Sequence, residues 1–310
     1  MSEIVVGVDG GGSKTRVLVG TAEGEVLATV DGPKSAVSPG EAGRSADVIA
    51  ELVTRALSEI AQPGAIFPRV LYCGVAGTGR EEERRALHSA LDAKELAEEV
   101  VIDSDGLIAM YDAFDDRAGI LLVVGTGSIA YGRSPAGEIV RCGGWGPTFG
   151  DEGSGGWIGK RALGIVAASS DGREPATALL FPILSATNCE DVQDLIPWAA
   201  AADARAFATL APVVFSTAAA GDQRANALIT LAAEELVLHI RALARQLFTD
   251  ERAAVTVALS GGLMGRGSPL RKRLEQRLKS AVPGAQLRSE EVLPARGALR
   301  AAARRIRLPT

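Results

Sequence analysis

The period of the apolar positions changes along the chain, and these changes predict a series of strands and helices. Apolar runs at 3–9, 15–20 and 25–30 are separated by glycine-rich or Glu-Gly turns. Short runs bounded by turn residues predict three strands in an antiparallel meander. The period then switches between helix and strand, which predicts a helix at 41–61, a strand at 69–77, a helix at 80–93 and a strand at 98–105.

A second series of elements begins near the middle of the chain and resembles the first. The sequence Val-Val-Gly occurs at 5–7 before the first glycine turn. It occurs again at 123–125 before a second glycine turn. Similarity at half the chain length predicts a duplicated domain, because solenoid repeats have periods of about 20 to 50 residues. The expected elements are strands at 119–128, 129–134, 138–144 and 254–262, and helical stretches at 154–169, 203–219 and 225–248.

Composition and charge narrow the class of protein. The 310 residues are 47% hydrophobic, which is enough for two domains that each bury a core. Lysine and arginine number 33 against 38 acidic residues, so a net charge of -5 offers no basic surface for nucleic acid or an anionic membrane. No secretory signal or run of about 18 apolar residues is found, so we expect a cytoplasmic protein with a small-molecule partner.

Cys73, Cys142 and Cys189 form no CxxC pair and are expected to be reduced packing residues.

The glycine turn at 9–15, Asp-Gly-Gly-Gly-Ser-Lys-Thr, is the first candidate for phosphate binding. It is not a P-loop, because Lys14 comes one residue too late, and not a dinucleotide fingerprint, because Thr15 stands where a third glycine is needed. Both motifs also lead into a helix, whereas 15–20 reads as a strand. Glycines let backbone N–H groups approach phosphate oxygens, and the Asp9 carboxylate can orient a hydrated Mg²⁺. A flexible hairpin without a ligand is the alternative for this turn taken alone.

Two further glycine turns make a nucleotide site the better interpretation. Residues 123–128, Val-Val-Gly-Thr-Gly-Ser, repeat the arrangement with the hydroxyls of Thr126 and Ser128 as additional donors. Residues 258–265 place two glycines after a strand and before a helix. Two turns that face each other across a cleft can hold a triphosphate, and a strand-Gly-Gly-helix junction can accept the flat face of adenine.

These turns give the sequence a resemblance to the acetate kinase, sugar kinase, Hsp70 and actin superfamily of ATPases. Within it, the sequence resembles the N-acetylglucosamine kinase and BadF-type ATPase family. The most specific match is 143–163, where Gly-Trp-Gly is followed by Gly-Asp-Glu-Gly-Ser and Trp-Ile-Gly. The resemblance runs from residue 4 to 294–306, although 170–250 matches only in helical character. It implies ATP and Mg²⁺ as cofactors, Asp9 as a metal ligand, and nucleotide contacts from Asp9, Gly11, Gly12, Ser13, Lys14, Thr126, Gly127, Gly261 and Gly262.

The resemblance also implies the fold and the domain limits. It implies an α/β fold of two duplicated ribonuclease-H-like, actin-like ATPase domains with an interdomain cleft. Residues 1–114 with 295–310 are the expected N-terminal domain, since the last helix of this family packs back on the first domain, and 115–294 are the C-terminal domain. The family further implies a homodimer.

Phosphoryl transfer to a hydroxyl requires a base, and the strand at 98–105 offers two candidates. Asp105 lies twenty residues before Gly125, a spacing that resembles that of the catalytic Asp of the family, and Asp103 is its close rival. A carboxylate at a strand end that opens into a cleft is well placed to take a proton from the acceptor. The structural alternative is that Asp105 only caps a helix over 106–115.

Residues that match the sugar site of the family lie mostly in the segment 143–154. Asp151 matches a residue that accepts hydrogen bonds from sugar hydroxyls, and it or Ser154 could instead cap the following helix. The segment Gly144, Trp145 and Gly146 matches the wall around the 2-substituent of an amino sugar, with a core position as the alternative for Trp145. The set of substrate-binding residues expected is Ser35, Asp105, Ser128, Gly144, Trp145, Gly146 and Asp151.

The sequence departs from the family at the loop after the third strand. Amino-sugar kinases of this family carry an Asn there, whereas 31–42 has none, so Ser35 or Ser38 would have to take its place. Glu152, Lys160, His88 and His239 receive no functional role from the pattern.

The sequence therefore predicts an ATP:sugar phosphotransferase that acts on an amino sugar or a related hexose. A BadF-type ATPase that activates an electron-transferring enzyme is the alternative, and it requires a cluster-binding cysteine pair that the wide spacing of Cys142 and Cys189 does not provide. A filament-forming or chaperone ATPase would leave the segment 143–157 unexplained.

Overall fold

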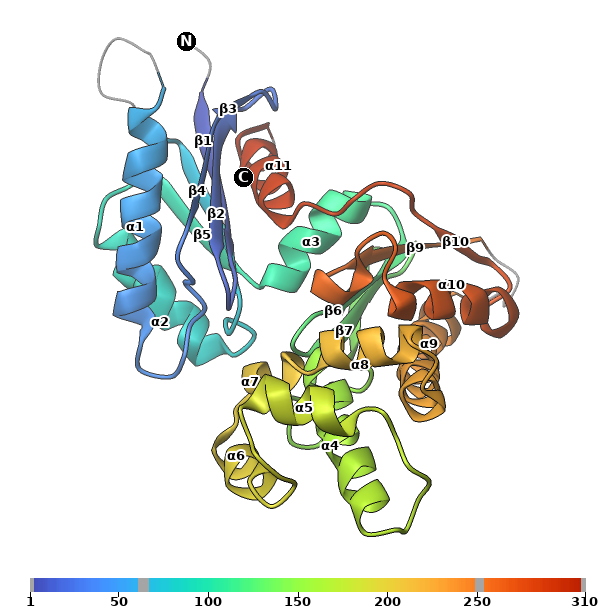
Figure 1. Ribbon diagram of the computed structural model, residues 1–310. Coiled ribbons are helices and arrows are strands. Elements are labelled where there is room, and N and C mark those ends of the chain that lie inside the picture. Colours follow the sequence, from blue (N-terminus) through green and yellow to red (C-terminus); the bar gives the residue numbers. More distant parts are fainter. Residues whose placement is uncertain (1–2, 61–66, 249–253, 308–310) are drawn as a thin grey trace. The chain divides into compact units, whose positions relative to one another are not determined.

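Two five-stranded sheets form the framework of the computed structural model, which describes residues 3–60, 67–248 and 254–307 (Figure 1). The chain divides into two compact units. Met1–Asp116 with Val292–Thr310 form what we call the N-terminal unit, and Arg117–Glu291 form the C-terminal unit. Each unit contains one of the sheets, as a duplicated α/β fold requires.

The N-terminal unit is a mixed sheet with helices on both faces. Its elements are β1 (Ile4–Gly10), β2 (Thr15–Thr21), β3 (Val26–Gly32), α1 (Ala42–Ser58), β4 (Val70–Val75), α2 (Glu81–Asp92), β5 (Glu99–Asp103), α3 (Asp105–Phe114) and α11 (Pro294–Arg307). The sheet order is β3-β2-β1-β4-β5, in which β1, β2 and β3 form an antiparallel meander and β1, β4 and β5 are parallel. The predicted order of elements over this part of the chain is confirmed.

Successive residues of the central strands point to opposite faces of this sheet. Val6 packs in a cluster with Ile49 of α1 and Leu87 of α2, whereas its neighbour Val5 packs in a second cluster with Leu299 of α11. Figure 1 shows α1 and α2 on one side of the sheet and α11 on the other. Because both faces are covered, β1 and β4 read as nearly continuous apolar runs rather than as alternating patterns.

The C-terminal helix α11 packs against β1 and α3. Gly297 permits the close approach, because a Cβ placed there would lie 1.9 Å from the carbonyl oxygen of Ile108. The buried carboxylate of Asp112 in α3 accepts hydrogen bonds from the Arg296 guanidinium at 2.5 and 2.8 Å and from the Leu293 N–H at 2.8 Å. These bonds fix α3 to the segment that leads into α11.

The C-terminal unit repeats this sheet and adds a helical region. Its elements are β6 (Gly119–Val124), β7 (Ser128–Arg133), β8 (Ile139–Gly143), α4 (Gly155–Ser170), α5 (Leu180–Thr187), α6 (Leu195–Ala201), α7 (Ala204–Ala208), α8 (Ala211–Ala219), α9 (Gln223–Leu247), β9 (Val255–Ser260), the 3₁₀ helix η1 (Gly262–Met264), α10 (Pro269–Ala281) and β10 (Ala285–Leu287). The sheet order β8-β7-β6-β9-β10 has the same antiparallel and parallel pairings as its counterpart. The predicted duplication is therefore confirmed by topology.

The helical region between β8 and α9 differs in part from the prediction. The single stretch expected at 203–219 consists of two helices, α7 and α8, because Pro212 in the first turn of α8 has no N–H to continue the helical ladder. The helices α5 and α6 were not predicted, since each is short and carries a proline in its first turn. Among the helices of the described residues, none is long and apolar enough to span a membrane.

Candidate active site

The tip of the β1–β2 hairpin is the first predicted phosphate-binding turn. The N–H of Gly11 donates to the carbonyl oxygen of Lys14 at 3.0 Å and closes the turn. Gly12, Ser13 and Lys14 are exposed at its tip. The Gly11 carbonyl accepts from the N–H of Ser35 at 3.3 Å, which ties the base of the turn to the loop after β3. The turn is thus anchored at its base and accessible at its tip, as anion binding by a glycine turn requires.

Ser35 lies behind this turn. The residue is 2% exposed, and its hydroxyl lies 2.7 Å from the hydroxyl of the buried Thr15. A Cβ placed on Gly10 would lie 2.6 Å from Ser35 Oγ, so the two residues are in close contact. Ser35 therefore supports the turn, and of the two serines considered for the place of the missing Asn, Ser38 is the exposed one.

Asp9 stands in β1 directly before the turn, between Arg16 of β2 and Gly74 of β4. Burial and the neighbouring Asp105 carboxylate raise the pKa of Asp9 to about 6, against the opposing effect of Lys14. A cation would offset the repulsion between the two carboxylates, and carboxylate oxygens are the ligands that Mg²⁺ prefers. The described residues contain no cluster of three or more His, Cys, Asp and Glu side chains that could hold a metal. Asp9 therefore fits an ion that is bound mainly by phosphates and water, which is usual for Mg²⁺.

The two candidate bases at the end of β5 have different surroundings. The Asp103 carboxylate accepts a hydrogen bond from the Tyr72 hydroxyl, and burial raises the pKa of Asp103 in spite of that bond. Asp105 is exposed to solvent, yet it is crowded closely enough by protein atoms that desolvation raises its pKa as well. Of the two, Asp105 is the one whose charge acts on Asp9.

Ser104 explains how the chain turns from β5 into α3. Its side chain accepts a hydrogen bond from the Leu107 N–H at 3.3 Å and caps the helix. The interpretation of Asp105 as the cap is therefore wrong. Asp105 is the first helical residue, and its carboxylate accepts from the Gly106 N–H at 2.9 Å, where the helix dipole also favours a negative charge.

The β6–β7 turn is the second predicted phosphate-binding turn, and it rests on α4. The N–H of Gly125 donates to the Gly127 carbonyl at 2.9 Å. The carbonyl oxygens of Gly125 and Thr126 accept from the N–H groups of Gly155 and Gly156 at 2.9 and 3.0 Å. These N–H groups open α4 and have no partner within the helix. The turn is fixed by these bonds, while Thr126 is exposed at its tip.

The third glycine turn lies beside the second, because β9 and β6 are paired strands. Gly261 has a φ of 93°, and a Cβ placed on it would lie 2.4 Å from the Val124 carbonyl oxygen. Only glycine fits this position. Gly261 and Gly262 are exposed, and the chain then enters η1 and α10. Within the C-terminal unit, the structure thus brings together the two turns predicted to hold phosphate and adenosine.

Asp151 is held between two neighbouring loops. It has a φ of 57°, and its carboxylate accepts hydrogen bonds from the backbone N–H groups of Ser128 and Gly146. Its Oδ2 would lie 2.7 Å from a Cβ on Gly127, so the carboxylate lies against the second glycine turn. Burial raises the pKa of Asp151. Of the two caps considered for α4, Ser154 is the one observed, and the capping interpretation of Asp151 is wrong.

Ser128 positions this carboxylate. The residue is 3% exposed, and its hydroxyl donates to the Glu152 carbonyl at 2.7 Å. Since its N–H donates to Asp151, Ser128 ties the start of β7 to the loop that precedes α4. Its hydroxyl proton is thus engaged within the protein.

Trp145 projects from the glycine segment into solvent. Its exposed fraction is 60%, so the interpretation of Trp145 as a core residue is wrong. The backbone reaches this arrangement through Gly144 and Gly146, which have φ values of 69° and 87°. The guanidinium carbon of Arg141 lies 4.7 Å from the centre of the indole ring. An exposed indole on a glycine segment is available as a wall for a ligand.

His239 in α9, which received no role from the sequence pattern, lies against the glycine segment. It is buried, with Nδ1 2.8 Å from the Glu235 carbonyl and Nε2 3.8 Å from a carboxylate oxygen of Glu152. Because a carbonyl only accepts, Nδ1 carries a proton. A Cβ on Gly143 would lie 2.4 Å from Nε2, so the ring supports the start of the glycine segment. A single histidine in an amphipathic helix gives no sequence signal, because only the packing of α9 on β8 reveals its neighbours.

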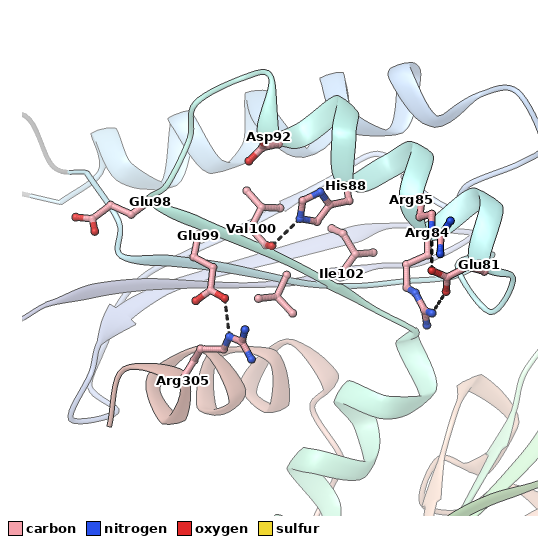
Figure 2. Close-up of a pocket in the computed structure, with 11 residues that line it drawn as sticks. Glu81, Arg84, Arg85, His88, Asp92, Glu98, Glu99, Val100, Ile102 and Arg305 are labelled. Carbon is pink, nitrogen blue, oxygen red and sulfur yellow. Dashed lines mark hydrogen bonds and ion pairs between the residues drawn. The ribbon is translucent and has the colours of Figure 1, made fainter. Parts of the chain in front are cut away.

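A pocket of about 520 Å³ lies in the N-terminal unit along the edge strand β5 (Figure 2). Helices α2 and α11 supply its walls. His88 Nε2 lies 3.1 Å from the Val100 carbonyl, and Arg305 pairs with Glu99 at 2.6 Å. None of the predicted site residues lines this pocket. The side chains drawn in Figure 2 cover the open edge of the sheet, a usual protection against pairing with another strand.

Residues 6–302 match the model of the BadF/BadG/BcrA/BcrD ATPase family. The chain therefore belongs to this family, as the resemblance implied. Its fold is the actin-like ATPase, or ribonuclease-H-like, fold of two related sheets.

Individual relatives align over nearly their whole length. An N-acetylmuramic acid/N-acetylglucosamine kinase of Clostridium acetobutylicum is 30% identical over 83% of this chain and 84% of its own. An N-acetyl-D-glucosamine kinase of Dictyostelium discoideum is 29% identical over 96% of each chain. The solved structure of a candidate N-acetylglucosamine kinase from Chromobacterium violaceum superposes with a TM-score of 0.79, at 30% identity, over 96% of this chain and 98% of the other.

Proposed function

We propose that this protein is an ATP-dependent kinase that phosphorylates a hydroxyl group of an amino sugar or a related hexose. The observation that carries the proposal is the segment 143–154, where the Asp151 carboxylate lies against the second glycine turn with the exposed Trp145 beside it. Two relatives at about 30% identity, both named as kinases of N-acetylglucosamine, support the same reaction class.

ATP is assigned to the three glycine turns. In this assignment the β1–β2 and β6–β7 turns bind phosphate through Gly11, Gly12, Ser13, Lys14, Thr126 and Gly127, and Gly261 and Gly262 accept the adenosine. Asp9 would hold Mg²⁺ through oxygen ligation, and the ion would supply positive charge next to the phosphates. We assign the residues 1–114 with 295–310 and 115–294 to the two ATPase domains.

The acceptor sugar is assigned to the segment 143–154. The Asp151 carboxylate, already oriented by two N–H groups, has lone pairs left for sugar hydroxyls. Gly144 and Gly146 let the backbone approach the sugar, and Trp145 covers its apolar face. Ser35 and Ser128 act in this scheme through the turns they support, because both hydroxyls are buried.

A carboxylate at the end of β5 takes the proton of the attacking hydroxyl. We assign this role to Asp105, because it is exposed and its charge acts on Asp9. Asp103 remains the rival, since its raised pKa also suits a base. The reaction then requires only in-line placement of the hydroxyl and the terminal phosphate, compensation of the phosphate charge, and removal of one proton.

The experiment that tests the proposal is ADP release across four acceptors: N-acetylglucosamine, glucosamine, N-acetylmuramic acid and glucose. We expect ATP-dependent release with at least one of them and a product heavier by one phosphoryl group. Since the Asn of the family loop is absent, discrimination among the four should be weaker than in a relative that has it. Four inert acceptors in a protein that still binds ATP would contradict the proposal.

A second measurement separates the kinase from an ATP-driven activator of electron transfer. The thiol of Cys73 is buried, and burial raises its pKa, so it is a poor cluster ligand. We expect anaerobically purified protein to lack stoichiometric iron, and brown protein whose colour is lost in Cys142→Ser would favour the activator. A homodimer in the cytoplasm remains our expectation, and light scattering tests the oligomeric part of it.

A further inference from the structure

Asp105 stands at the junction between β5 and α3, and a buried tyrosine of β4 contacts both of these elements. The hydroxyl of Tyr72 donates a hydrogen bond to the carboxylate of Asp103, the last residue of β5. The ring of Tyr72 also lies edge-on to Tyr111 of α3, with the ring centres 6.3 Å apart. One buried side chain therefore touches the strand and the helix between which Asp105 lies.

The loop after β4 provides a second contact with the end of β5. Thr78 is buried, and its hydroxyl lies 2.7 Å from the carbonyl oxygen of Val75 and 2.8 Å from the carbonyl oxygen of Asp103. Because a carbonyl only accepts, the one hydroxyl proton is shared between the ends of β4 and β5. Asp103 is thus held at its side chain by Tyr72 and at its backbone by Thr78.

The first turns of α3 are fixed to β4 by close packing. Gly74 of β4 pairs with Asp103 in the sheet, and a Cβ placed on Gly74 would lie 2.4 Å from the side chain of Ile108. Ile108 is fully buried. The chain is therefore fixed by hydrogen bonds at Asp103 and by packing at Ile108, while Asp105 between them stays exposed.

The surroundings of Asp103 suit an anchor better than a base. Burial, together with the charge of Asp103, raises the pKa of Tyr72, so the phenol keeps its proton and remains a donor. Burial raises the pKa of Asp103, but the bond from Tyr72 acts against this and favours the charged carboxylate. A carboxylate that accepts a permanent internal hydrogen bond has less capacity left for the proton of an acceptor hydroxyl.

We propose that Asp103 is a positioning residue, which Tyr72 and Thr78 hold so that the junction of β5 and α3 presents the Asp105 carboxylate to the acceptor hydroxyl. Tyr72 and Thr78 are positioning residues in the same sense, because they act on Asp105 through Asp103. This inference rests on the proposed kinase function and assigns different roles to the two carboxylates at the end of β5.

Conservative substitutions test the two contacts separately. Tyr72→Phe removes only the hydroxyl, and we expect it to lower kcat about tenfold while the KM values for ATP and sugar change less than about twofold, because misplacement of the base affects the chemical step rather than binding. Thr78→Val should have a similar effect. Thr78→Ser is the matched control, since it keeps the hydroxyl and should have nearly the kcat of the wild type.

A double-mutant cycle distinguishes positioning of Asp105 from a general loosening of the fold. If the Tyr72 hydroxyl acts through Asp105, Tyr72→Phe should cause no further loss of kcat in an Asp105→Asn background. Two losses of kcat that multiply would contradict the inference, because the hydroxyl would then act independently of the Asp105 carboxylate.

The outcomes separate this inference from the kinase proposal. If a sugar is phosphorylated but Tyr72→Phe keeps the wild-type kcat, or if Asp103→Asn rather than Asp105→Asn abolishes turnover, the inference is wrong and the kinase proposal stands. If none of the sugars is phosphorylated, the kinase proposal fails, and amide hydrogen exchange tests the junction directly. Exchange of the Gly106 and Leu107 N–H groups that is at least about tenfold faster in Tyr72→Phe would support the positioning role, and unchanged exchange would overturn it.

Discussion

The β1–β2 and β6–β7 hairpins have the same pattern of hydrogen bonds. In each, the first residue after the turn is a buried hydroxyl that donates to a carbonyl of the loop after the third strand. Thr15 donates to Pro33 at 2.6 Å, and Ser128 donates to Glu152 at 2.7 Å. Carbonyls of both turns also accept N–H groups from further along the chain: Gly11 accepts from Ser35 and Ala36, and Gly125 and Thr126 accept from the first two residues of α4. Duplication has therefore kept the scaffold of both glycine turns.

The chemistry of the two hairpins differs at one pair of positions. The positions compared are the paired residues one step before the pair that flanks each turn. In the β1–β2 hairpin they are Asp9 and Arg16, and in the β6–β7 hairpin they are Val123 and Ile129. The first hairpin therefore supplies its own carboxylate, and the second receives one from Asp151 in the neighbouring loop. The two hairpins therefore share one backbone arrangement, whereas the carboxylate next to each turn comes from a different part of the chain.

The largest expected effect concerns the base beside the first hairpin. We expect Asp105→Asn to lower kcat by at least about 10², and up to about 10⁴, with ATP affinity changed only a few fold. Steady-state kinetics together with nucleotide binding measure both quantities. Asp103→Asn is the matched control at the same strand end. Near-normal turnover in Asp105→Asn with collapse in Asp103→Asn would transfer the role to Asp103.

The charge of Asp9 is expected to cost stability in metal-free protein. The folded-state pKa of about 6 lies above the ordinary 3.8, so the folded state binds a proton more tightly than the unfolded state. Stability should therefore fall as pH rises from about 4 to 6 and remain reduced above that range. A rise of the Asp9 pKa from 3.8 to about 6 corresponds to a loss of at most about 3 kcal/mol in the free energy of unfolding.

Denaturant unfolding of Asp9→Asn in the presence of a chelator measures this cost. The variant should be more stable than the wild type at pH 8 and should lack the decline between pH 4 and 6 attributable to Asp9. It should also lose activity if Asp9 holds Mg²⁺. A variant less stable than wild type at pH 8 would show that the Asp9 carboxylate is stabilising.

The contact between the second turn and Asp151 predicts a smaller effect. A methyl group on Gly127 would lie 2.7 Å from Asp151 Oδ2, so Gly127→Ala should displace the carboxylate and raise the KM for the sugar about tenfold. Gly125→Ala is the control, because a Cβ there meets nothing within 4 Å. Equal KM values for the sugar in the two variants would show that Asp151 does not bind the acceptor.

The smallest expected effect tests the buried hydroxyl–carbonyl hydrogen bond that the two hairpins share. Thr15→Val and Ser128→Ala each remove a buried hydroxyl and leave a carbonyl without its donor, which should lower the free energy of unfolding by about 1 to 2 kcal/mol. Only Ser128→Ala should also raise the KM for the sugar, because Ser128 positions Asp151. Thermal unfolding measures the loss of stability, and steady-state kinetics measure the KM for the sugar. A raised sugar KM in Thr15→Val but not in Ser128→Ala would contradict the prediction.

The sequence by itself determined the elements, the duplication and the three glycine turns. Strands β1 and β4, the meander and the helix α9 follow from local period and turn residues, which act over a few positions and can be read from the chain. The segment 143–154 was identified through its resemblance to the family, which its glycines and Asp151 carry. The helices α5 and α6 were missed, since short segments with early prolines lack a clear period.

Only the tertiary structure decided which side chains are accessible. Ser35 and Ser38 look alike in the sequence, yet Ser35 is buried behind the first turn and Ser38 is exposed. Trp145 could have been a core residue and is in solvent, while His239 in a surface-like pattern lies buried beneath Gly143. These outcomes depend on strands and helices far apart in the chain. Burial is a property of the neighbours that folding brings together, and a local pattern does not contain them.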